Sequence, residues 1–212
     1  FHVIDVADPA NPSWEGSFKL GAGIGHNVNA IIVREQIYLG SAKTIAFVTS
    51  SATTTSHPEV YILNVTNPAA ISEIGTFNAP GIRYGLGLAV AGNRLYLGRQ
   101  GDSASTDNSF HIVNISNLAS PAELGTGHNF HASVISMVIT GELAFLGTTD
   151  AAAEFQIWNI TDPDSLFLHN CDPFNFAQLG NGMDFHDNIV YVAVRSQNAF
   201  RIIYDTLNPV CS

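Results

Sequence analysis

The chain of 212 residues is 46% hydrophobic, which is enough for a sizeable core, and 12% of its residues are charged. Eight Lys and Arg residues stand against 18 Asp and Glu residues, for a formal net charge of −10. This balance, without any basic cluster, excludes nucleic acid as an expected partner, and no apolar run approaches the roughly 18 residues of a membrane span.

One short pattern recurs along the whole chain: an aromatic or aliphatic residue, any residue, two aliphatic residues, Asn or Asp, and a further aliphatic residue. Its copies begin near residues 1, 60, 110, 155 and 200. Repeats of this length are typical of propellers and solenoids. We therefore expect a single repeat domain over residues 1–212. Because the first copy starts at Phe1, we also expect the chain to be a piece of a longer protein.

Each period predicts four short strands. Within residues 110–155 they fall at 110–115, 122–125, 131–139 and 143–147, separated by Gly, Pro, Asn and Ser. Paired strands are expected in the other periods at residues 29–33 and 37–40, 85–90 and 95–98, and 183–186 and 190–194. Four antiparallel strands per period of about 45 residues are the unit of a β-propeller blade. The sequence thus predicts an all-β propeller of about four blades, with residues 29–33, 85–90, 134–139 and 183–186 as inner strands; a β-sandwich with accidental similarity is the alternative.

The residues that follow each copy resemble a known family. The run VIDVADPANP over residues 3–12 is similar to the LVIVD repeat, and residues 64–68 and 159–163 are similar to it as well. The resemblance implies a β-propeller of a secreted or cell-surface microbial protein without an assigned enzymatic activity. Asn replaces the motif's Asp in three copies, Leu118 replaces its Pro, and the last copy departs after Ile203. The resemblance carries over no catalytic residues.

The predicted strands do not fill whole blades. With strands labelled a to d in blade order, the chain supplies c–d, three complete a–b–c–d sets, and then a–b–c. The fifth c strand leaves three interpretations open: a fragment of a larger propeller, a self-contained small propeller, or strand exchange with a neighbouring molecule. Under the third, residues 1–6 or 200–205 would add to a sheet edge of a second copy and build a fibre or matrix.

Two features predict an extracellular glycoprotein. Cys171 and Cys211 are expected to form a disulfide, which over a loop of this length would contribute roughly 4 kcal/mol. Two unpaired buried thiols are the alternative. Asn64, Asn114 and Asn159 begin N-x-Ser/Thr sequons at one equivalent position of three repeats. The same residues also favour turns, so sequon and turn are both open explanations.

Candidate sites follow from blade geometry. The b–c and d–a connections share one end of each blade, where we expect the binding face, with candidates His26, Asn27, Arg83, Tyr84, His128 and His131. A transition-metal site would need the histidines to converge, and a calcium site would need Asp102, Asp107 and Asp150 to do so. No compact ligand spacing or nucleophile motif is present, so we expect no metal, cofactor or catalytic residue.

Two classes of function fit these observations. The first is a non-enzymatic, extracellular or cell-surface structural or interaction protein, with itself, another protein or a glycan as partner. The alternative is a propeller enzyme, a hydrolase or an oxidoreductase, with its site at the mouth of the channel.

Overall fold

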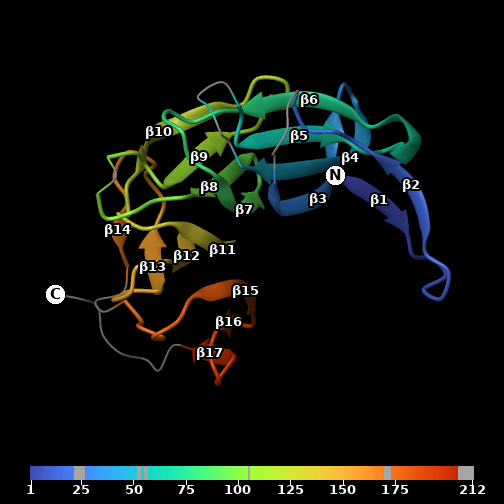
Figure 1. Ribbon diagram of the computed structural model, residues 1–212. Helices are drawn as coiled ribbons and strands as arrows, with labels where there is room; N and C mark the ends of the chain where they lie inside the picture. Colours follow the sequence, from blue (N-terminus) through green and yellow to red (C-terminus); the bar gives the residue numbers. More distant parts are fainter. Residues whose placement is uncertain (22–26, 52–53, 55–56, 105, 170–172, 205–212) are drawn as a thin grey trace. The chain divides into compact units, whose positions relative to one another are not determined.

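The computed structural model describes residues 1–21, 27–51, 54, 57–104, 106–169 and 173–204. In these residues the chain forms seventeen strands and one short 3₁₀ turn, η1 (Pro68–Ala70), which confirms the predicted all-β fold class. The strands form five sheets (Figure 1). No helix in the described residues is long and apolar enough to cross a membrane.

The sheets contain two, four, four, four and three strands in chain order. Their strands are, in the first, β1 (His2–Asp5) and β2 (Ser13–Ser17); in the second, β3 (Val28–Tyr38), β4 (Ser41–Ser50), β5 (Val60–Asn64) and β6 (Ser72–Phe77); in the third, β7 (Gly85–Ala91), β8 (Arg94–Arg99), β9 (Phe110–Asn114) and β10 (Ala122–His128); in the fourth, β11 (Val134–Thr140), β12 (Leu143–Thr148), β13 (Phe155–Asn159) and β14 (Phe167–Leu168); and in the fifth, β15 (Gly180–His186), β16 (Ile189–Val194) and β17 (Phe200–Tyr204). This is the predicted c–d, three-times a–b–c–d, a–b–c order. The four segments expected as inner strands lie in β3, β7, β11 and β15, the first strands of their sheets.

One predicted boundary is wrong. The sequence predicts residues 29–33 and 37–40 as two paired strands. Instead β3 runs on to Tyr38, the turn lies at Leu39 and Gly40, and β4 begins at Ser41. Both turn residues have positive φ, 51° and 76°, as tight hairpins with the twist of the strands require. The polar residues before Tyr38 resembled a turn because alternate side chains of β3 face solvent.

The connections at the two ends of the sheets differ in length. Every first-to-second-strand turn has two residues (39–40, 92–93, 141–142, 187–188), and every c–d connection has seven (6–12, 65–71, 115–121, 160–166). At the other end, the b–c connections have five to ten residues (51–59, 100–109, 149–154, 195–199). Constant length points to a structural role, whereas variable length is typical of loops that carry function.

Asx turns explain the constant c–d length. In the first position, Oδ1 of Asp5 accepts a hydrogen bond from the backbone N of Ala7 at 2.8 Å, and Asn64 and Asn159 do the same with the residue two positions on. In the second position, Asp8, Asn67, Asn117 and Asp162 accept from the backbone two residues on at 3.0–3.1 Å. Asn and Asp favour such turns because their short side chains replace a backbone acceptor. The Asn and Asp residues of the repeated motif therefore serve to form these turns.

Glycines on the d strands hold consecutive repeats together. A Cβ on Gly16 of β2 would lie 1.9 Å from the carbonyl oxygen of Pro68, and one on Gly75 of β6 would lie 2.4 Å from that of Leu118. Gly125 of β10 approaches the carbonyl of Pro163 in the same way. In each case the d strand of one repeat packs against the c–d turn of the next. We call these three contacts the glycine–turn contacts.

The chain divides into two compact units. The first comprises Phe1–Gly85 and Ile115–Ala122, and the second comprises Leu86–Asn114 and Glu123–Ser212. The core of the first unit gathers Leu20, Ala46, Val48, Tyr61, Leu63 and Val65. The second unit has two core clusters, one around Phe110, Phe130 and Leu146, the other around Phe145, Phe155 and Val192. The central strands β4, β5, β8, β9 and β12 supply most of the fully buried residues, as expected for sheets covered on both faces.

Candidate functional site

Three candidate binding residues of the first unit, Asn27, Arg83 and Tyr84, lie in its d–a connections. The backbone N of Ser51 donates to the carbonyl oxygen of Asn27 at 2.9 Å, and Ser51 also forms a β-bridge with Tyr84. Asn27 and Tyr84 are therefore brought to one site and are exposed, while Arg83 beside them is half-buried. His26 lies outside the described residues.

The candidate residues of the second unit have different environments. His128 is half-buried, with its ring centroid 4.7 Å from that of Phe130 and 4.9 Å from that of Trp158. Burial lowers the pKa of His128, and the nearby His131 lowers it further. His131 is exposed, with a φ of 54° that is uncommon outside glycine, and its backbone N donates to Oδ1 of Asn129 at 2.8 Å. The structure thus separates a packing histidine from an exposed one.

The lowered pKa of His128 predicts acid lability. The unfolded chain takes up a proton near the ordinary value of 6.5 while the folded protein still excludes it, so stability is present above that pH and is lost as the pH falls. We expect His128→Gln to lose less thermal stability than wild type between pH 7.5 and pH 5, measured by circular dichroism. His2→Gln, which changes an exposed histidine, is the control. Identical pH dependence of wild type and His128→Gln would contradict this prediction.

A recurring buried acceptor shapes these connections, and the sequence reasoning missed it. The residue just before strands β5, β9 and β13 accepts a hydrogen bond from the following d–a connection. Oε2 of Glu59 accepts from the backbone N of Ala79 at 2.9 Å, Oγ of Ser109 from Phe130 at 3.1 Å, and Oε2 of Glu154 from Phe176 at 2.8 Å. All three acceptors are buried. An alignment of the repeats on the first residue of β5, β9 and β13 would have placed these three polar residues at one equivalent position.

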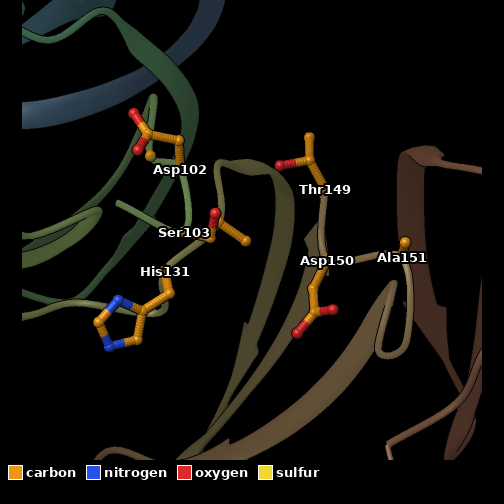
Figure 2. Close-up of a pocket in the computed structure, with 8 residues that line it drawn as sticks. Asp102, Ser103, His131, Thr149, Asp150 and Ala151 are labelled. Carbon is orange, nitrogen blue, oxygen red and sulfur yellow. The ribbon is translucent and has the colours of Figure 1, made fainter. Parts of the chain in front are cut away.

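One pocket of about 420 Å³ lies at the variable end of the second unit (Figure 2). Ser133 joins its loops: the hydroxyl donates to the carbonyl oxygen of Gly101 and accepts from its N, both at 3.1 Å, and its backbone N donates to Oγ1 of Thr149 at 2.9 Å. The pocket is lined by Gly101, Asp102, Ser103, His131, Ala132, Thr149, Asp150 and Ala151. Of the predicted binding residues, His131 lines this pocket.

The chemistry of the pocket suits a polar ligand better than a metal ion. Figure 2 shows the carboxylates of Asp102 and Asp150 pointing in different directions. Their Oδ1 atoms accept from the backbone N of Ala104 and Ala152, each at 2.9 Å. Within the described ranges, no three His, Cys, Asp or Glu side chains are grouped so as to hold a metal ion. Asp107 is half-buried and is not among the residues that line this pocket.

A second polar cluster is enclosed in the third sheet. Arg99 is fully buried, and its Nη1 donates to the carbonyl oxygen of Asn108 at 3.1 Å and lies 3.1 Å from Nε2 of His111. Nδ1 of His111 lies 2.6 Å from Oε1 of Glu123. Nε2 of His111 also lies 3.3 Å from the carbonyl oxygen of Asn108. The cluster fixes the β8–β9 connection against β9 and β10 and takes no part in the pocket.

The sequon asparagines lie at the ends of β5, β9 and β13. Asn64 and Asn159 use Oδ1 to accept from the backbone N of the sequon's own Thr, the contact that Asp5 makes in the first repeat without a sequon. Turn formation therefore accounts for the residue type at this position, and glycosylation of Asn64, Asn114 and Asn159 stays a prediction. Cys171 and Cys211 lie outside the described residues, so their disulfide stays a prediction as well.

The fifth sheet ends at an exposed apolar strand. β17 pairs with β16 from Phe200 opposite Ala193 to Tyr204 opposite Ile189, and in the described part of the chain its other edge pairs with no strand. Phe200, Ile202 and Tyr204 are 61%, 53% and 63% exposed, whereas Phe155, which has the place of Phe200 in the preceding repeat, is fully buried. An unpaired strand edge is a template for pairing with another chain.

Comparisons with known proteins support the fold. Residues 83–127, which contain β7 to β9 and all but the last residue of β10, match the family model of the LVIVD repeat, so the predicted resemblance is confirmed there. The computationally designed Ika4 protein is similar at a TM-score of 0.57 and 13% identity, over 88% of this chain and 95% of its own. Raptor of Chaetomium thermophilum is similar at 0.62 and 12% identity, over 91% of this chain and 17% of the Raptor chain. No curated protein matches this sequence.

Proposed function

We propose that this chain, whose residues 83–127 form an LVIVD repeat, is a non-enzymatic structural or interaction protein of the cell surface or extracellular space that assembles by strand addition. One observation carries the proposal: the fifth sheet has three strands where the three sheets before it have four, and its last strand presents exposed apolar side chains. A strand from a neighbour at this edge would form main-chain hydrogen bonds and cover those side chains.

The strand composition supports assembly. β17 reads FRIIY, with no Lys or Pro, the residues with which proteins commonly block an edge strand. In a complete sheet the fourth strand covers the edge of the third: β6 pairs with β5 along five positions. A low proportion of charged residues, two cysteines and three sequons favour an extracellular location.

The enzymatic alternative finds little support at the pocket. In the described part of the chain, His131 is exposed and its imidazole is not hydrogen-bonded to a carboxylate, as a general base held in place by a partner would be. The His111–Glu123 pair is close, but it lies in the buried cluster and outside the residues that line the pocket.

The proposal is tested by the mass of the purified chain in solution, measured by light scattering over a range of protein concentrations. We expect wild type to form dimers or larger assemblies and Ile202→Lys to be monomeric, because a charge at the pairing edge opposes strand addition. Ile82→Lys, at an exposed position of the connection between β6 and β7, should assemble as wild type does. A wild type that stays monomeric at every concentration overturns the proposal, and so does an Ile202→Lys variant that assembles unchanged.

A further inference from the structure

We infer that the strand that pairs with β17 is β17 of a second copy, in a two-fold arrangement centred on Ile202. The inference rests on the proposed assembly by strand addition and names its partner and register. It would join two fifth sheets into one continuous six-stranded sheet, in the order β15-β16-β17-β17-β16-β15.

Symmetry fixes the geometry. A strand that pairs with its own copy around a two-fold axis must run antiparallel to it, and the same patch is then used by both subunits. Full overlap of Phe200–Tyr204 places Ile202 opposite Ile202 of the second copy. Phe200 is then opposite Tyr204 at both ends of the pairing, and Arg201 is opposite Ile203.

The residues are self-complementary in this register. Phe200, Ile202 and Tyr204 lie on one face of the sheet, because side chains alternate along a strand, and all three are more than half exposed. Directly opposite residues interact most strongly, and aromatic and β-branched pairs are favourable there. The register therefore creates two Phe–Tyr pairs and one Ile–Ile pair. It places no like charges opposite each other, since Arg201 is the one charged residue of β17 and faces Ile203.

The strand beside β17 extends the same surface. Tyr191 of β16 is opposite Ile202, and its ring centroid lies 6.0 Å from that of Phe200 in a stacked arrangement. The rings of Phe200 and Tyr191 thus hold the apolar row in place before any partner arrives. On the opposite face, Ile203 packs against the core cluster of Phe155 and Val192, which anchors β17 to its own sheet.

Charge complementation tests the register. Ile202→Lys and Ile202→Glu should each be monomeric, because a residue opposite itself meets its own charge. Mixing the two, one of them isotope-labelled, should restore a dimer that contains one copy of each by native mass spectrometry. Phe200→Lys mixed with Phe200→Glu is the register control, and mixing should not increase its dimer fraction, because these residues are opposite Tyr204 instead of each other. Thermal unfolding of every variant confirms that it is folded.

The possible outcomes distinguish self-pairing of β17 from strand addition in general. A mixed Ile202 dimer together with an unresponsive Phe200 pair supports the self-pairing register. Assembly that is lost in both Ile202 variants but not restored by mixing overturns the register and leaves strand addition to a different edge or partner. A monomeric wild type overturns both.

Discussion

Replacing Gly75 with alanine should destabilise the protein by about 1–3 kcal/mol or more, the usual cost of forcing an extra methyl group into a packed site. The new Cβ would lie 2.4 Å from the carbonyl oxygen of Leu118 and 3.1 Å from the Cα of Ala119. Both are backbone atoms, so relief requires the β9–β10 turn to move away from β6. Thermal unfolding followed by circular dichroism should show a midpoint several degrees below that of wild type.

Gly182→Ala is the matched control. This glycine also lies in a strand, β15, but a Cβ there would be 3.9 Å from the Cβ of Ala193, an ordinary contact. Its midpoint should stay close to wild type. If both variants lower the unfolding midpoint equally, alanine is unfavourable at any glycine of these strands. The glycine–turn contact would then not explain the loss of stability at position 75.

Phe155→Ala should cost about 3–5 kcal/mol, because it removes a fully buried ring and leaves a cavity. The ring is stacked on Phe145 at a centroid distance of 6.2 Å, and its centroid lies 5.7 Å from that of Phe174 and 5.9 Å from that of Phe176. The neighbours come from β12 and from the connection after β14, so the loss should loosen both. Chemical denaturation monitored by fluorescence measures the difference.

The control occupies the same place in the repeat. Phe200→Ala changes the equivalent aromatic residue of the last copy, which is 61% exposed. Measured at a dilution where the chain is monomeric, it should change stability by roughly 0.5 kcal/mol or less, as exposed substitutions usually do. A large loss at Phe200 under those conditions would show that β17 is covered within one chain, against the proposed assembly.

The repeat architecture was predictable because local chemistry determines it. Asp5, Asn64 and Asn159 form their turns with residues two positions away, and Gly92 and Gly141 take positive φ at two-residue hairpins. Such contacts leave a short pattern that returns with every copy. Five copies of that pattern were sufficient to predict the number and order of the strands.

The rest depends on contacts between residues far apart in the sequence. The end of β3 was misplaced because solvent on one face of a long strand gives the same polar residues as a turn. The acceptor role of Glu154 requires Phe176 to lie beside it, and the pocket requires Gly101, Ser133 and Thr149 to meet. The burial of Arg99 could not be predicted from the sequence either. It depends on Asn108 in the β8–β9 connection and on His111 in β9, which contact Arg99 only in the folded sheet.

The unequal connection lengths have a consequence for how such a chain can diversify. The seven-residue turns carry the Asx turns and the glycine–turn contacts, so inserting a residue there would shift one repeat out of register with the next. The connections at the opposite end vary without touching those contacts, as the residues 100–109 and 195–199 illustrate. Loops on that end can be lengthened, shortened or grafted from one repeat to another while the scaffold stays aligned, which makes it the natural place to engineer a new specificity.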